Sequence, residues 1–264
     1  MKNIILLPLM ILMICLSGCN QKEQFDRSVE NIKTTFYEEQ IELLKNQKFD
    51  ALKNTFHFAL KRQNGLDQTL DQMSKLFPNE KEHSKKIIAH RSAINTINGV
   101  KNTNTEIVLE YEYSNIWLII SLQTTQAVNE ATKITNFNVS TSKEPMEIVY
   151  AFSLKNKTLY HFLLLSSAII IPLLILYALI MCIKTPLAKR KWLWILFILF
   201  GIGGITLNWT TGDFFINPLY FQLFGSGYAR LSPYSPVMLK ISLPLGAILF
   251  LLLKEKLSKK ARDS

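Results

Sequence analysis

The sequence has little cysteine and no arrangement of residues that identifies a catalytic reaction. Three cysteines occur among the 264 residues, at positions 15, 19 and 182, which excludes a small domain stapled by disulfides. The four histidines show no spacing typical of a zinc site, and the sequence contains no glycine-rich phosphate loop and no nucleophile elbow. The sequence therefore predicts a protein without a catalytic residue, a metal site or a cofactor.

The net charge of +10 is unevenly distributed along the chain. Residues 20–158 contain 18 Lys and Arg against 17 Asp and Glu, so this half is nearly neutral. Most of the basic excess lies in segments 184–191 and 254–264, which flank long apolar runs. Basic residues beside apolar runs are typical of the cytoplasmic side of membrane spans. The charge therefore indicates a membrane protein and argues against a nucleic-acid partner.

Residues 1–18 predict an export signal. Lys2 precedes an apolar run from Ile4 to Leu16, and small residues follow it. The Leu16-Ser17-Gly18-Cys19 stretch resembles the bacterial lipobox, in which the cysteine thiol is acylated, for example with palmitate, and the chain is cut just before it. We therefore expect a signal peptide over 1–18 and lipidation of Cys19. An uncleaved membrane helix is the alternative, but the run is short against the ~20 residues that a span needs.

Residues 19–145 predict an exported α+β domain, followed by a linker over 146–158. Apolar residues recur at helical spacing in segments 25–43, 49–60 and 66–77. Residues 104–113, 116–122 and 132–141 then alternate as strands do, and 86–98 is β-like but less regular. The order favours N-terminal helices on one face of an antiparallel β-meander.

The C-terminal half predicts three transmembrane α-helices, at 159–183, 192–208 and 237–253. The basic segments 184–191 and 254–264 would be a cytoplasmic loop and tail, and 209–236 an external aromatic loop. The exported domain would then face the periplasm, with the protein in the bacterial cytoplasmic (inner) membrane. The glycines at 201, 203 and 204 would allow close packing of the second helix.

The helix-then-meander pattern resembles the small cone-shaped folds of the NTF2-like and cystatin-like kind. Tyr111-Glu112-Tyr113 with Trp117 is similar to an aromatic hairpin of small bacterial lipoproteins, and segments 191–197 and 207–212 resemble an uncharacterised family of bacterial membrane proteins. The resemblance implies a fold and no reaction. The residues predicted for a pocket or an interface are Tyr111, Tyr113, Trp117, Trp209 and Asp213.

Two functions follow as hypotheses. The first is a non-enzymatic membrane lipoprotein that acts as an accessory, scaffold or sensing component, with membrane lipid and a membrane protein or a second copy as partners. The alternative is that the cone binds a small molecule or lipid, or acts on one as an enzyme. The acidic clusters 38–42 and 106–112 are expected to be solvated faces. A transporter is a third candidate, which three spans with little buried charge do not favour.

Overall fold

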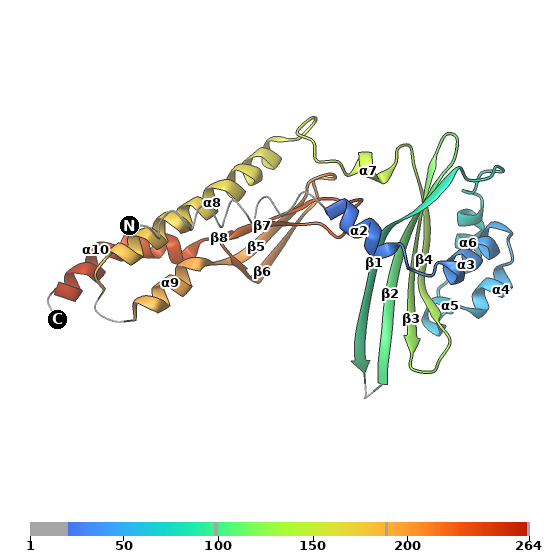
Figure 1. Cartoon of the computed structure of the whole chain (residues 1–264), viewed down its shortest axis with the longest axis horizontal. Helices are drawn as coiled ribbons and strands as arrows, with labels where there is room; N and C mark the ends of the chain where they lie inside the picture. Colours follow the sequence, from blue (N-terminus) through green and yellow to red (C-terminus); the bar gives the residue numbers. More distant parts are fainter. Residues whose placement is uncertain (1–20, 98–99, 188–189, 263–264) are drawn as a thin grey trace. The chain divides into compact units, whose positions relative to one another are not determined.

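The structure is a computed structural model that describes residues 21–97, 100–187 and 190–262. Its chain divides into two compact units (Figure 1). Of the described residues, unit 1 contains those up to Val149 together with Leu231–Ser235, and unit 2 contains those in Tyr150–Arg230 and from Pro236 onward. The chain therefore passes between the units three times, and unit 1 takes a five-residue segment from late in the sequence.

The helices of unit 1 come first, as the sequence predicts. They are α2 (Gln21–Val29), α3 (Thr35–Lys45), α4 (Phe49–Asn54), α5 (Phe58–Lys61) and α6 (Leu66–Ser74), and a last turn, α7 (Met146–Val149), follows the sheet. In α3, the buried side chains Tyr37, Ile41 and Leu44 recur every three or four residues and so share one face. The predicted helix over 25–43 is in fact two helices separated by residues 30–34.

The sheet of unit 1 is an antiparallel meander in the order β1-β2-β3-β4. Its strands are β1 (Ser84–Ile97), β2 (Val100–Glu112), β3 (Trp117–Ala127) and β4 (Lys133–Ser142). Along β3, buried residues alternate with partly buried ones, which is the pattern of a strand with one face on a core. The α+β part of the predicted fold therefore agrees with the structure.

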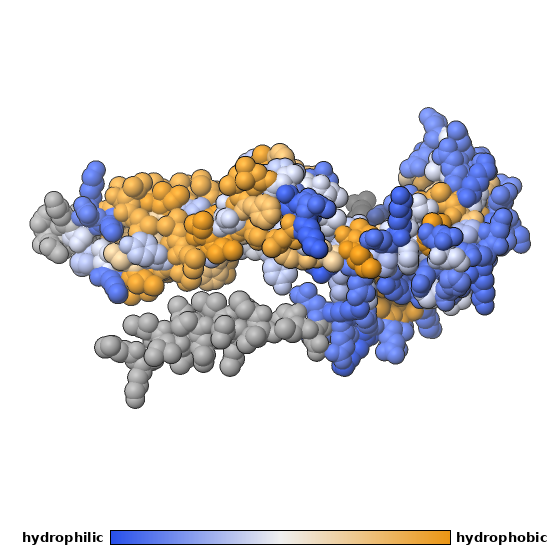
Figure 2. All heavy atoms as spheres, turned by 90° about the horizontal axis from the view of Figure 1, so that it is seen from above, coloured by the Kyte–Doolittle hydropathy of each residue, from blue (hydrophilic) through white to orange (hydrophobic). Residues whose placement is uncertain are grey.

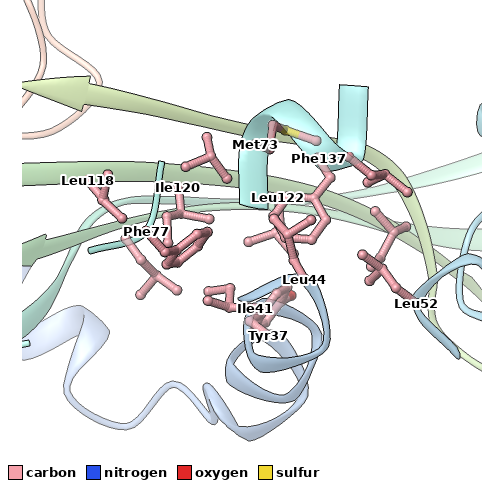
Figure 3. Close-up of a cluster of buried hydrophobic side chains, with 14 of the residues drawn as sticks. Tyr37, Ile41, Leu44, Leu52, Met73, Phe77, Leu118, Ile120, Leu122 and Phe137 are labelled. Atoms are coloured by element: carbon pink, nitrogen blue, oxygen red, sulfur yellow. The ribbon is translucent and has the colours of Figure 1, made fainter. Parts of the chain in front are cut away.

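The core of unit 1 lies between the helices and one face of this sheet (Figure 3). Leu44, Leu52, Leu118 and Leu122 are fully buried there, and aromatic side chains from α3 and β4 fill the space between them. Burying a leucine side chain contributes roughly 1.5–3 kcal/mol. A single cluster of this kind can hold the helices on the sheet without disulfides.

Unit 2 begins with α8 (Leu159–Lys184), a 26-residue helix that contains Pro172. The chain continues through α9 (Lys191–Leu199), β5 (Phe200–Asn208), β6 (Phe214–Leu223), β7 (Ser226–Ala229), β8 (Met238–Leu243) and α10 (Leu245–Arg262). The four strands form an antiparallel sheet in the order β6-β5-β8-β7. Side chains of α8, α9 and α10 share a buried cluster that includes Ile175, Ile198 and Phe250.

The prediction of three C-terminal transmembrane helices is wrong. Among the described residues, only α8 is long and apolar enough to cross a membrane. The predicted span 192–208 is the nine-residue helix α9 followed by strand β5, and the predicted span 237–253 is strand β8 followed by the start of α10. Glycines at 201, 203 and 204 lower helix propensity in the first segment, and Pro244 separates strand from helix in the second. The predicted loop 209–236 contains strands β6 and β7.

Candidate functional site

The aromatic residues predicted for a pocket in unit 1 do not share one face of the sheet. Tyr111 and Tyr113 are 6% and 2% exposed and belong to the core of unit 1. In the register of β2 and β3, Tyr111 pairs with Leu118, whereas Trp117 pairs with Glu112. Since directly paired residues project from the same face and neighbours along a strand from opposite faces, Trp117 lies on the face away from the tyrosines. The three residues therefore do not line a common pocket.

Burial governs the ionisation of the two tyrosines. It raises the pKa of Tyr113 to about 12, and it raises the pKa of Tyr111 further, with added repulsion from carboxylates such as Glu38 and Glu82. Both phenols are therefore neutral at physiological pH. A neutral phenol in a filled apolar core serves as a packing residue and not as a general base.

A groove of about 680 Å³ opens on the surface of unit 1 where α3 and α6 end. Its lining includes Lys45, Lys75 and Lys81 together with Glu80. The last carbonyls of a helix carry partial negative charge, which lysines in the last turn compensate. Glu80 accepts hydrogen bonds from the backbone N–H and the hydroxyl of Ser114, which lower its pKa. Lys45 lies in the last turn of α3 and Lys75 pairs with Asp71 of α6, so the local structure accounts for these two charges and for Glu80.

Trp209 and Asp213, the predicted site residues of the C-terminal half, belong to unit 2. Trp209 is 1% exposed, and its ring stacks on Phe152 and meets the edge of His161. The Trp209 Nε1 donates to the carbonyl of Ser153 at 2.9 Å, and the backbone carbonyl of Trp209 accepts a hydrogen bond of 2.7 Å from Lys157 Nζ. Asp213 is exposed and accepts a hydrogen bond from Thr211. The tryptophan therefore anchors the chain that leads into α8, and the carboxylate closes a turn.

Gly212 is required where this turn covers α8. Its φ is +83°, and a Cβ there would lie 2.6 Å from the hydroxyl oxygen of Tyr160. We expect Gly212→Ala to destabilise the turn by about 2 kcal/mol, because left-handed strain and a steric clash add. Hydrogen exchange of amides 208–213 measures the loss. Adding Tyr160→Phe removes the hydroxyl that the new Cβ would meet and should recover part of the lost stability. Equal protection of these amides from exchange in the single and double variants would show that the steric clash contributes nothing.

A polar network that the sequence does not reveal lies on the second face of the sheet of unit 1. Glu110 is 3% exposed, although the acidic cluster 106–112 is expected to be solvated. Its Oε1 lies 2.9 Å from Lys86 Nζ, and its Oε2 accepts a hydrogen bond of 2.6 Å from the backbone N–H of Met146. The buried carboxylate thus ties β1 and β2 to the turn α7.

Tyr234, from the segment Leu231–Ser235, extends this network. Lys86 Nζ lies 4.7 Å from the centre of the Tyr234 ring, and the Tyr234 hydroxyl donates to Asp26 of α2 at 3.1 Å. Burial and the neighbouring Asp26 raise the pKa of Tyr234. Ser232 Oγ donates to the carbonyl of Ile88, where β1 is irregular. The network therefore joins α2, the sheet, α7 and the late segment within unit 1.

This network binds segments of the chain together and has no nucleophile paired with a base. Its donors and acceptors engage one another, and no group of three or more His, Cys, Asp or Glu able to hold a metal occurs among the residues described. The local sequence gives one hint of this network, because Glu110 lies between the apolar residues Leu109 and Tyr111.

The second notable surface is the exterior of unit 2, which is apolar over most of the face seen in Figure 2. Large exposed apolar side chains occur on each of its long elements: Leu163, Ile169, Ile170, Leu173 and Ile180 on α8, Trp192 and Leu196 on α9, Phe214, Phe215, Ile216, Leu219 and Phe221 on β6, and Leu252 on α10. Soluble monomers rarely expose apolar patches of this extent. This surface, rather than a cleft, is the main candidate for a contact with a partner or with lipid.

Cys19, the predicted lipidation site, and the signal peptide 1–18 lie outside the described residues. No protein-family model matches the chain, and searches of curated proteins and of solved structures find no match either. The functional argument therefore rests on the residues themselves.

Proposed function

We propose that this protein is a non-enzymatic membrane lipoprotein that acts as an accessory, scaffold or sensing component. In this proposal unit 2 inserts in the bacterial cytoplasmic membrane, Cys19 carries the acyl anchor, and unit 1 faces the periplasm. The single observation that carries the proposal is the exposed apolar exterior of unit 2, because exposing so large an apolar surface to water is unfavourable.

The composition of α8 supports insertion. Its mean hydropathy is 2.7 over the most apolar window, and only 11% of that window is buried inside the structure. A 26-residue helix is about 39 Å long and exceeds a hydrocarbon core of about 30 Å. A core helix of a soluble protein would instead be mostly buried. Lys184 lies in the last turn of α8, and Arg190 and Lys191 follow the helix, as is typical of the cytoplasmic side.

The sheet of unit 2 supports a location at the level of the lipid headgroups. Strand β6 is an edge of the sheet, and backbone groups at a free edge cannot be left unpaired in hydrocarbon. Most of its side chains are exposed, so the strand is not covered by the rest of unit 2. Pro218 removes one donor from this edge and so disfavours pairing with a further strand.

Insertion of α8 is tested by a charge at its centre. Leu173 is 59% exposed, so Leu173→Arg leaves the buried cluster of unit 2 intact. The test is made in a background in which residues 1–19 are replaced by a cleavable secretory signal, so that no acyl anchor at Cys19 holds the protein. A charge at mid-membrane costs about 3 kcal/mol, and we expect the variant to be released by alkaline carbonate while the unsubstituted protein stays in the membrane pellet. Leu173→Phe is the matched control and should stay in the pellet. Release of the unsubstituted protein by carbonate would disprove the proposal.

The scaffold role is tested by native mass spectrometry of the protein extracted gently from its own membrane. A mass of residues 19–264 with acyl chains and a second polypeptide is the expected result. The same mass with only a small molecule bound would favour ligand binding instead.

A further inference from the structure

Lys240 is a cation on the sheet of unit 2 for which the described residues provide no salt bridge. Its ammonium lies 5.6 Å from the centre of the Tyr220 ring, and no carboxylate of the part of the chain that the structure describes lies within ion-pair distance. The side chain is partly exposed on β8. A positive charge in an apolar surface is costly unless an anion or the membrane interface receives it.

Neighbouring strands place polar side chains around Lys240. Thr206 of β5 and Gly227 of β7 pair directly with it, so the Thr206 side chain shares its face of the sheet. The Tyr220 ring lies over Gly204, where a Cβ would come within 2.8 Å of it, and the Gln222 amide lies against Gly227 in the same way, at 2.7 Å. Two glycines thus let side chains of the edge strand reach across the sheet.

These four residues, Thr206, Tyr220, Gln222 and Lys240, form what we call the Lys240 site. Gln222 Oε1 accepts a hydrogen bond from Ser242 Oγ, which leaves its NH₂ group as a donor. The ammonium, two hydroxyls and this amide therefore offer donors, as a phosphate oxygen requires. The apolar rim of the site includes Phe215 of β6, which is 63% exposed and pairs directly with Thr206, so its ring lies on the same face of the sheet.

The level of the site along α8 suits a headgroup. Leu239, next to Lys240, packs in a cluster with Leu164, Leu165 and Ala168. These residues lie roughly 8–14 Å from the start of α8, because each helical residue adds 1.5 Å. In a bilayer with a hydrocarbon core of about 30 Å, this level belongs to one leaflet and not to the midplane. A lysine there can extend its ammonium toward the phosphates of that leaflet.

We propose that the Lys240 site binds the phosphate of an anionic phospholipid whose acyl chains lie on the apolar rim. The inference rests on the proposed insertion of unit 2 in lipid. An anionic lipid is favoured over a zwitterionic one because the site offers no carboxylate to a choline group.

The test uses the full chain in detergent, titrated with phosphatidylglycerol or with phosphatidylcholine of the same acyl chains, and counts bound lipids by native mass spectrometry. We expect the wild type to prefer phosphatidylglycerol by about tenfold, as a charge-assisted hydrogen bond allows. Lys240→Gln should abolish this preference, and Lys240→Arg should retain most of it. Lys254→Gln on α10 removes the same charge elsewhere and should leave the preference unchanged.

Three results would overturn the inference: a preference that Lys240→Gln leaves intact, an equal loss in Lys254→Gln, or inorganic phosphate that binds with the same dependence on Lys240. The last result would assign the site to free phosphate. Failure here is distinguishable from failure of the proposed function, because carbonate extraction of the protein without its acyl anchor tests insertion without regard to lipid class.

Discussion

Replacing Glu110 with alanine should lower the free energy of unfolding of unit 1 by about 3 kcal/mol. The carboxylate is 3% exposed, and its loss leaves the buried N–H of Met146 without its acceptor. The side chain of Lys86 is 38% exposed, so water can solvate its ammonium once the carboxylate is gone. The expected cost therefore lies at the lower end of the roughly 3–5 kcal/mol that is typical when one partner of a buried ion pair is removed. Hydrogen exchange of β2 and of residues 143–149 in the full chain measures the effect.

Two further variants separate the ion pair from simple side-chain loss. Glu112→Ala removes a partly buried glutamate two positions along β2, which accepts a hydrogen bond from Ser84, and should cost no more than about 1 kcal/mol. The double variant Lys86→Met with Glu110→Leu replaces both charges by apolar groups and should be less destabilised than Glu110→Ala. If Glu110→Ala is no worse than Glu112→Ala, the network does not stabilise unit 1.

The order of helices and strands in unit 1 could be predicted because apolar residues recur with a helical period in the helices and with a period of two in the strands. Ile107, Leu109 and Tyr111 alternate along β2 and are buried, as strict alternation requires. Pro78 ends the third helical segment, and Ser114-Asn115 separates β2 from β3. These signals are local, so reading them needs no knowledge of the fold.

Unit 2 could not be predicted in the same way, because a continuous apolar run does not distinguish a helix from a buried strand. Residues 192–208 contain one such run, and the structure changes from helix to strand at Phe200. The glycines that we interpreted as a helix-packing surface instead lie in β5, where Gly204 makes room for Tyr220. In the described part of unit 2, the apolar run of α8, with 26 residues, is too long for a buried strand, so its length alone indicates a helix.

The candidate sites were hidden for a different reason. The Tyr234 hydroxyl and Asp26 are separated by 208 positions in the sequence, and nothing near either residue indicates the other. The same holds for Lys240 and Tyr220, which meet only because β5 and β8 pair. Contacts between distant segments depend on topology, and the topology of unit 2 was the part predicted wrongly.

Raising the pH from 10 to 12 should unfold unit 1, because its buried tyrosines resist ionisation. The pKa of Tyr113 is about 12 in the folded chain against about 10 when unfolded. A raised folded pKa stabilises the fold below pH 10, and this contribution is lost as the pH rises through the folded pKa. Tyr113 alone accounts for about 2–3 kcal/mol, and the raised pKa values of Tyr111 and Tyr234 act in the same direction.

The contribution of the tyrosines can be separated from that of other side chains by removing the phenol groups alone. The double variant Tyr111→Phe with Tyr113→Phe keeps both rings in the core and removes both phenols, so its stability should fall less steeply between pH 10 and 12. Tyr150→Phe leaves both core phenols in place and should follow the wild type. Urea unfolding of the full chain at each pH, read by hydrogen exchange in β2 and β3, gives the slopes. Parallel slopes for the double variant and the wild type would show that alkaline unfolding starts elsewhere, because the only groups removed are the two phenols that burial holds neutral.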